Sequence, residues 1–157
     1  MKTLVFWGGG RAALARARAD DGAALLLWDG RGEAALREAG VPFRRASDLL
    51  QDDDQDAIDE AAIAWTKAWG KRPLVEGRSF REAVQWKGLS LWWLAELYLH
   101  HSTRAPARVR VIETFRRLLE RVGPDEVEAV GLSAEDALLL ARTCSALRIL
   151  CHGAPAR

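Results

Sequence analysis

The sequence predicts an α/β fold: a three-layer Rossmann-like domain with a short parallel sheet and a large helical insertion. Two apolar runs, 2–7 and 23–28, are continuous rather than alternating, which is typical of strands covered on both faces. Each run ends at a glycine turn, the first at Gly8-Gly9-Gly10 and the second at Asp29-Gly30. A strand–helix–strand pattern returns at 127–151, and such a unit joins two parallel strands through a crossover.

The first third of the chain alternates strands with helices. We expect a strand at 2–7, a helix at 11–19, a strand at 23–28, a helix at 32–39 ended by Gly40, and a third strand starting at 41–43. Pro42 has no backbone N–H to donate, so the third strand should lie at the sheet edge or only begin there. The expected strand order is 3-2-1-4-5.

The middle of the chain, about 54–123, is predicted to be the helical insertion. Residues 56–69 have apolar side chains at helical spacing, and Ser79 and Glu82 have the spacing of a capping box. Residues 89–101 are apolar almost all round, which indicates a buried helix. The tryptophans of this region are expected to belong to the core. A further helix is predicted from an apolar stripe made of Val111, Ile112, Phe115, Leu118, Leu119 and Val122. After this helix we expect a strand at 127–130, a helix at 137–147 and a strand at 149–151.

Composition limits the classes of function. The chain has 157 residues, of which 49% are hydrophobic and 29% charged, with a net charge of +1. We therefore expect one globular domain over 1–157, without the positive field that steers proteins to nucleic acid. No apolar run is long enough to span a bilayer, and the N-terminus lacks a signal-peptide pattern, so we expect a cytoplasmic protein with no transmembrane segment. Cys144 and Cys151 match no zinc motif and should be small buried side chains, and no metal site is expected.

The loop after the first strand is the best candidate for ligand binding. Gly8, Gly9, Gly10 and Arg11 begin a loose G-x-G-x-x-A pattern, in which glycines let a phosphate approach the backbone at a helix N-terminus. Asp29 follows Gly8 by 21 residues, where a ribose-binding carboxylate stands in dinucleotide folds. The alternative is an ordinary strand-to-helix turn and an ordinary Asp-Gly turn.

Three further side chains could adjoin the same edge of the sheet. His152 follows the last strand, so it could share a crevice with the glycine loop, and the alternative is a solvated histidine. Trp7 and Trp28 end the first two strands, where each ring could stack on a ligand or fill the edge of the core.

The segment 77–101 (GRSFREAVQWKGLSLWWLAELYLHH), and its centre 86–92 above all, resembles the N-terminal half of bacterial surface-polysaccharide glycosyltransferase-like proteins. The resemblance implies a two-domain architecture in which the N-terminal domain shapes the acceptor side of a cleft. The second domain binds most of the nucleotide sugar. These residues would then be the N-terminal part of a larger protein, inactive alone, with the next domain attached near 153. Lys87 and Ser90 match the segment, although capping and solvation explain them as well.

Three functions follow as hypotheses. The first is the N-terminal domain of a glycosyltransferase-like protein of surface carbohydrate synthesis, with a sugar or nucleotide ligand. The second is a small nucleotide- or dinucleotide-binding module, which needs Asp29 and the glycine loop to form a crevice. The third is a non-catalytic interaction domain or homo-oligomer, which needs an exposed apolar patch. No particular cofactor or catalytic residue can be named from the sequence.

Overall fold

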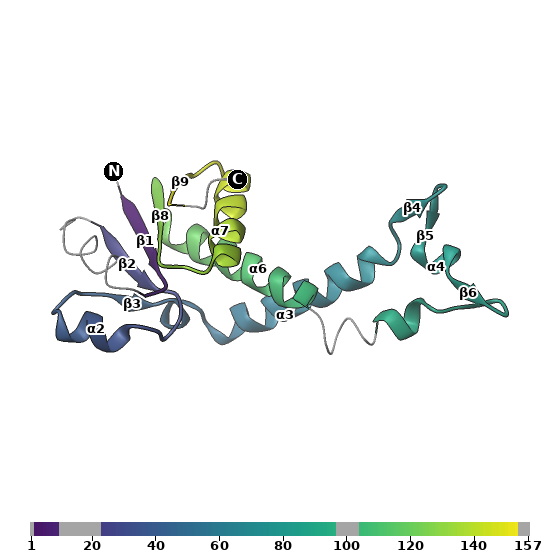
Figure 1. The fold of residues 1–157 in the computed structure, drawn as a ribbon, viewed down its shortest axis with the longest axis horizontal. Helices are drawn as coiled ribbons and strands as arrows, with labels where there is room; N and C mark the ends of the chain where they lie inside the picture. The colour runs from purple at the N-terminus through teal and green to yellow at the C-terminus, as the bar shows by residue number, and fades with distance from the viewer. Residues whose placement is uncertain (1, 10–22, 97–103, 154–157) are drawn as a thin grey trace. The chain divides into compact units, whose positions relative to one another are not determined.

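The computed structural model describes residues 2–9, 23–96 and 104–153. Five short strands form one sheet in the order β3-β2-β1-β8-β9, and every pair of neighbours is parallel (Figure 1). Numbered among themselves along the chain, the strands stand in the order 3-2-1-4-5, so the predicted Rossmann-like α/β fold is confirmed. The strands are β1 (Thr3–Trp7), β2 (Ala24–Leu27), β3 (Arg44–Arg45), β8 (Glu126–Val130) and β9 (Leu150–His152).

Both faces of the two central apolar strands are covered, which explains why their sequences do not alternate. On one face, Val5, Trp7, Leu25 and Leu27 form a buried cluster with Leu36 of α2 (Glu33–Glu38). Side chains alternate along a strand, so Phe6 points to the other face. There it meets the ring of Phe115 in α6 (Arg104–Val122), edge to face, at 5.3 Å.

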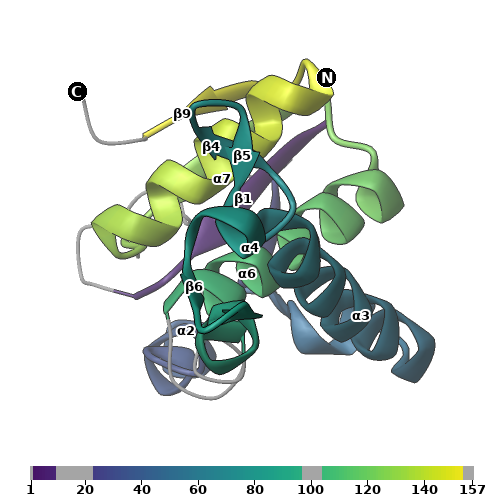
Figure 2. The ribbon, with the colours of Figure 1, turned by 90° about the vertical axis from the view of Figure 1, so that its right-hand side faces the viewer.

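The last crossover follows the predicted pattern. Helix α7 (Ala134–Leu147) links β8 to β9 and packs on both strands (Figure 2). Its first turn is capped by Ser133, whose hydroxyl oxygen accepts a hydrogen bond from the backbone N–H of Asp136 at 3.0 Å. Arg148 in the left-handed conformation ends the helix and turns the chain into β9. The third strand, β3, lies at the sheet edge after Pro42, and a short 3-10 turn, η1 (Ser47–Leu49), follows it.

The chain divides into two compact units. The sheet unit comprises Met1–Asp52 and Thr114–Arg157, and the inserted unit comprises Asp53–Glu113. The inserted unit contains most of α3 (Asp52–Trp69) and the first half of α6, and Arg110 of α6 pairs with Asp59 of α3 at 2.5 Å. The acidic residues from Asp52 to Asp56 belong to the first turns of α3, where carboxylates favour the positive end of the helix dipole.

The inserted unit is not wholly helical, which corrects the prediction. Two antiparallel hairpins lie between its helices: β4 (Pro73–Val75) with β5 (Arg78–Ser79), and β6 (Gln85–Trp86) with β7 (Leu89–Ser90). Their two-residue turns, 76–77 and 87–88, have positive φ at both positions, which is the type I′ geometry that suits strand twist. Between the hairpins lies α4 (Phe80–Ala83), where the Glu82 carboxylate accepts hydrogen bonds from the N–H and hydroxyl of Ser79 at 2.8 Å.

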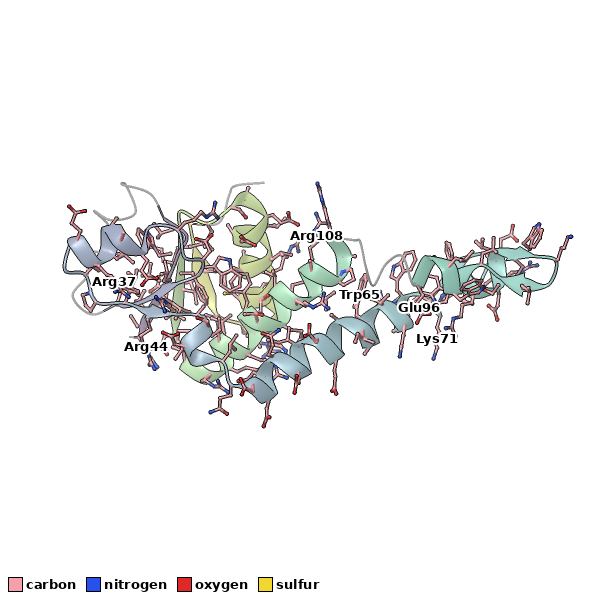
Figure 3. The ribbon with its side chains drawn as sticks, turned by 90° about the horizontal axis from the view of Figure 1, so that it is seen from below. Arg37, Arg44, Trp65, Lys71, Glu96 and Arg108 are labelled. Atoms are coloured by element: carbon pink, nitrogen blue, oxygen red, sulfur yellow. The ribbon has the colours of Figure 1, made fainter. Side chains whose placement is uncertain are left out.

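The predicted buried helix at 89–101 is also wrong at its start. Leu89 belongs to a hairpin, and helical structure begins at Trp92 and continues to residue 96, while 97–103 lie outside the described residues. Trp92 is buried, and its ring centroid lies 5.7 Å from that of Trp69 and 5.5 Å from that of Phe80. Glu96, which is labelled in Figure 3, accepts a hydrogen bond from Arg81 at 3.3 Å.

The tryptophans of the inserted unit are not all core residues. Trp92 is buried, whereas Trp86 and Trp93 are 59% and 56% exposed. The expectation that all of them fill the core is therefore wrong for Trp86 and Trp93. Among the described helices, none is long and apolar enough to cross a membrane.

Candidate functional site

The carboxyl ends of β1, β2 and β8 form the candidate site. The strand order reverses between β1 and β8, and ligands of open parallel sheets bind beyond the strand ends at such a point. Of the predicted residues, Gly8, Gly9, Asp29 and His152 belong to the described structure. Gly10 and Arg11, with the predicted helix at 11–19, lie outside it.

The glycine loop is held against the loop that follows β8. The backbone N–H of Gly8 donates to the carbonyl of Val130 at 3.0 Å. A Cβ on Gly8 would lie 2.6 Å from the carbonyl oxygen of Gly131. A Cβ on Gly131 would lie 1.9 Å from the carbonyl oxygen of Gly9. Gly9 and Gly131 also have φ of +104° and +68°, which favour glycine. Close backbone approach between two loops thus accounts for these glycines without any bound phosphate.

The loop after β2 contributes the charged groups. The Asp29 carboxylate accepts hydrogen bonds from the backbone N–H and the Nε of Arg31, at 3.1 and 2.8 Å, and forms an ion pair with its Nη2 at 2.5 Å. The hydrogen bond and charge of Asp29 raise the pKa of Arg31, with a smaller contribution from Asp136 in the first turn of α7. Asp29 therefore stands where the sequence predicted it, but its carboxylate already binds a guanidinium.

Arg31 is the residue that the sequence analysis missed at this edge. Its side chain is 71% exposed, and that of Asp29 is 30% exposed. The spacing Asp29-Gly30-Arg31 is the only sequence signal for the pair, and it also fits an ordinary polar turn. A Cβ on the next residue, Gly32, would lie 2.9 Å from the Trp7 ring, so the loop also packs tightly on the core.

His152 does not join the glycine loop. Strand β9 is short, and its register sets His152 beside Glu128, two residues before the end of β8. Its Nε2 pairs with the carboxylate of Glu126, the first residue of β8, so the imidazole is drawn toward the amino ends of the strands. The expected crevice shared by His152 and the glycine loop is not formed by the described residues.

Trp7 and Trp28 pack against protein atoms. Trp7 is 1% exposed and belongs to the buried cluster beneath α2, although its indole N–H finds no acceptor among the described residues. Trp28 is half-buried and stacks on Phe115 with ring centroids 4.1 Å apart. Of the two roles considered for these rings, filling the edge of the core is the one that the structure supports.

The two cysteines lie together where α7 meets β9. Cys144 is buried, Cys151 is half-buried, and a hydrogen bond joins the thiols. That bond raises the pKa of Cys144, which burial raises further, and lowers the pKa of Cys151. Within the described part of the chain, no three potential metal-binding side chains come together.

Comparison with known proteins gives no relative: no family model, no curated protein and no solved structure matches the chain.

Proposed function

We propose that the sheet unit binds a phosphate-bearing small molecule of the nucleotide or nucleotide-sugar class across the carboxyl ends of β1, β2 and β8. The observation that carries the proposal is the Asp29–Arg31 pair, an exposed guanidinium and a partly exposed carboxylate directly after β2, the strand next to β1, beyond which the strand order reverses. The first turn of α7 is close enough for Asp136 to act on Arg31 electrostatically.

The pair has the chemistry that such a ligand requires. A guanidinium binds phosphate oxygens through two parallel N–H groups, and an aspartate at the end of the second strand accepts hydrogen bonds from ribose hydroxyls. Asp29 holds Arg31 by its Nε and Nη2, which orients the guanidinium before a ligand arrives. Pre-orientation lowers the entropy lost on binding.

The proposal is one of binding rather than catalysis. In a glycosyltransferase-like protein this edge would face a second domain, which would supply the donor site and the reacting groups. That role rests on the resemblance of the segment 77–101, because a Rossmann-like fold alone serves many activities.

The test is a fluorescence titration with UDP, CDP, NAD, NADP and UDP- and CMP-sugars. Trp28 is the reporter, since it directly precedes Asp29 and is only half-buried. We expect saturable quenching by at least one nucleotide or nucleotide sugar, and a loss of affinity of about tenfold or more in Arg31→Gln. The control is Arg37→Gln, which removes an exposed arginine on α2 that pairs with Glu33 instead. Equal affinity in both variants, or no response to any compound, would refute the proposal.

A second candidate function is self-association through the inserted unit. Trp86 and Leu89 are opposite each other across the β6–β7 hairpin and are 59% and 64% exposed, and Trp93 and Leu94 are also at least half exposed. Exposed aromatic and aliphatic side chains of this size mark interaction surfaces. Analytical ultracentrifugation tests it: the double variant Trp86→Ser, Leu89→Ser should sediment as a monomer at concentrations where the parent chain forms dimers. A monomeric parent chain would dismiss this function.

A further inference from the structure

The two cysteines of the chain lie in contact at the edge of the sheet. Cys144 belongs to the last turn of α7, and Cys151 is the middle residue of β9. The Cys144 side chain is fully buried, whereas that of Cys151 is half-buried. The pair therefore joins a thiol that solvent can reach to a thiol that solvent cannot reach.

Main-chain hydrogen bonds hold both cysteines in regular structure. The carbonyl oxygen of Cys144 accepts from the backbone N–H of Ile149 at 2.9 Å, across the turn that Arg148 makes in the left-handed conformation. After this turn β9 runs parallel to β8, with Cys151 opposite Val127. The turn and the strand register thus bring the second cysteine back to the first, so their contact is a property of the fold.

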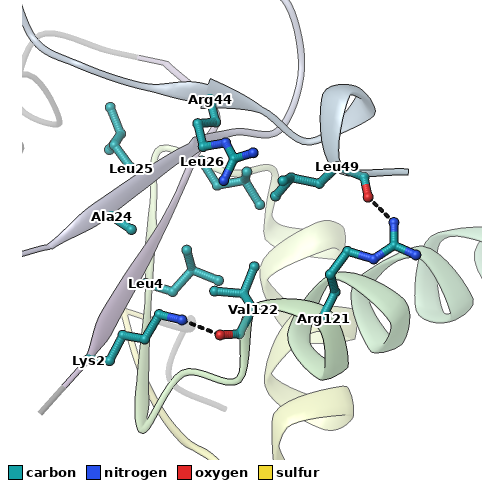
Figure 4. Close-up of a pocket in the computed structure, with 9 residues that line it drawn as sticks. All are labelled: Lys2, Leu4, Ala24, Leu25, Leu26, Arg44, Leu49, Arg121 and Val122. Carbon is teal, nitrogen blue, oxygen red and sulfur yellow. Dashed lines mark hydrogen bonds between the residues drawn. The ribbon is translucent and has the colours of Figure 1, made fainter. Parts of the chain in front are cut away.

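Cys151 lies on the face of the sheet that α6 and α7 cover. Residues opposite each other in parallel strands share a face, so Cys151, Val127 and Leu4 follow one another across β9, β8 and β1. On this face Leu4 lies beside Val122, the last residue of α6 (Figure 4). Among the described residues β9 has no neighbour on its outer side, so a small reactant has access to Cys151 from the sheet edge.

The two thiols are oriented toward each other. The hydrogen bond between them raises the pKa of Cys144 and lowers the pKa of Cys151, so Cys144 is the donor and Cys151 the acceptor. The Sγ atom of Cys151 also lies 3.9 Å from the main-chain carbonyl oxygen of His152. The thiolate is the nucleophilic form of cysteine. The half-buried sulfur is therefore also the one that ionises more readily.

We propose that Cys144 and Cys151 form a redox-active pair that reacts with peroxides and closes an intramolecular disulfide. In the first step the Cys151 thiolate attacks one oxygen of hydrogen peroxide. The O–O bond breaks, and the other oxygen leaves as hydroxide, which takes up a proton to form water. Cys151 is then a sulfenic acid.

In the second step the Cys144 sulfur attacks the sulfur of this sulfenic acid. The S–S bond forms and the S–O bond breaks, and the hydroxyl group leaves with the thiol proton of Cys144 as a second water. The cysteine pair is oxidised by two electrons, which reduce the peroxide. An external thiol reverses the reaction by exchange with the disulfide.

The disulfide would join the last turn of α7 to the edge strand. Its place in the fold differs from that of the proposed nucleotide site, because Asp29 and Arg31 follow β2, and β1 and β8 lie between β2 and β9. The proposal therefore stands whether or not the sheet unit binds a nucleotide. Arg31→Gln should leave disulfide formation unchanged, and Cys151→Ser should leave nucleotide affinity unchanged.

The test is peptide mapping of the full chain after the chain is reduced, freed of reductant and treated with one equivalent of hydrogen peroxide. Trypsin cuts after Arg142 and Arg148, so the disulfide would join the peptides 143–148 and 149–157. We expect these two peptides to appear joined, with a mass lower by two hydrogen atoms than the sum of the reduced peptides, and to separate after dithiothreitol. Their absence as a joined pair, or disulfides between separate chains only, would overturn the proposal.

A relocated thiol is the matched control. In the double variant Cys144→Ser, Ser145→Cys the thiol moves one position along α7, which turns it by about 100° around the helix axis to an exposed position. The same two tryptic peptides would carry the cross-link. Because the fold holds only position 144 against Cys151, we expect the relocated thiol to cross-link about tenfold more slowly or worse. Equal rates would show that the contact does not direct the reaction and would reject the proposal.

Single variants test the order of the two steps. With peroxide and dimedone, Cys144→Ser should accumulate a dimedone adduct on Cys151, because the sulfenic acid there has no thiol to react with. Cys151→Ser should leave Cys144 unmodified, because its side chain is buried. Circular dichroism that matches the parent chain shows that each variant is folded. A dimedone adduct on Cys144 in folded Cys151→Ser, with none on Cys151 in folded Cys144→Ser, would contradict the proposal.

Discussion

The backbone of Gly131 lies so close to that of Gly9 that a methyl group on Gly131 would stand 1.9 Å from the Gly9 carbonyl oxygen. The two residues follow β8 and β1, the strands between which the sheet order reverses. The contact therefore holds together the two loops that follow β1 and β8, at the carboxyl ends of the central strands of the sheet. It fixes the distance between the glycine loop and the first turn of α7, which begins three residues after Gly131.

Gly131→Ala is expected to destabilise the fold by at least about 2 kcal/mol, because it combines a positive φ with a backbone clash that no side chain can relieve. The control is Gly30→Ala in the neighbouring loop, where an added Cβ meets nothing within 4 Å. Urea unfolding followed by circular dichroism measures both variants. Similar free energies of unfolding for the two variants would show that the loops separate readily.

Phe115→Ala is expected to cost about 3 kcal/mol or more, the usual range for a fully buried phenylalanine. Phe115 packs α6 on the sheet: its ring centroid lies 5.3 Å from that of Phe6 and 4.1 Å from that of Trp28. The same change removes the ring stacked on Trp28, so the tryptophan emission should shift to longer wavelength. Leu138→Ala, at a 44% exposed position of α7, is the control and should change the free energy of unfolding far less. A loss below about 1 kcal/mol in Phe115→Ala would contradict the packing described.

The sheet could be predicted from the sequence because its signals are local. Continuous apolar runs predicted β1 and β2, and the strand–helix–strand pattern at 127–151 predicted the last crossover. The inserted unit could not be predicted in the same way. Its hairpin strands are two or three residues long, too short to show a period. The tight turn at Lys87-Gly88 directly precedes the segment 89–101, whose apolar content resembles that of a buried helix.

The candidate site was only partly predictable for a different reason. Gly8 has no room for a side chain because of its contact with Gly131, which lies more than 120 residues away, and no local pattern carries that information. Asp29 could be placed from its distance of 21 residues after Gly8. Its partner Arg31 is a polar residue in a turn, and nothing in the sequence distinguishes it from other polar turn residues.

Ser133→Ala is expected to destabilise the sheet unit by about 1 kcal/mol, the typical cost of removing an N-cap side chain. The Ser133 oxygen accepts from the N–H of Asp136 at 3.0 Å, and alanine would leave that donor to water. Ser145→Ala, at an exposed position near the other end of α7, should be neutral or slightly stabilising because alanine favours helices. The comparison is made by thermal unfolding at pH 7. A smaller loss at Ser133 than at Ser145 would show that the cap does not hold α7.

Glu33 is expected to make stability depend on pH. Its carboxylate binds Arg45 and Arg37, at 2.7 and 2.6 Å, and the hydrogen bond from Arg45 is the main cause that lowers its pKa below 4.5. A lowered pKa in the folded state stabilises the protein above the ordinary pKa, and this stabilisation is lost as the pH falls through the lowered value.

The variant Glu33→Gln should therefore be less stable than the parent chain at pH 7, and the difference should shrink as the pH falls to 3. Added salt should reduce the difference at pH 7, since the pairs are near the surface. The control is Glu38→Gln, which removes an exposed carboxylate at the other end of α2. Denaturant unfolding at a series of pH values measures the free energies of unfolding. If the difference between the parent chain and Glu33→Gln grows as the pH falls, the explanation is wrong.

Cys151 is expected to react with iodoacetamide before Cys144 does. Only the thiolate is nucleophilic, and the hydrogen bond between the two thiols lowers the pKa of Cys151 while it raises that of buried Cys144. Peptide mass spectrometry of native protein should show alkylation at Cys151, with a rate that rises at a lower pH than for a free cysteine. In Cys144→Ala the donor is lost, so the rate profile of Cys151 should move to higher pH, while Cys144 in Cys151→Ala should stay unreactive until the protein unfolds. Faster labelling of Cys144 than of Cys151 in the folded parent chain would show that the two thiols do not hold this arrangement in solution.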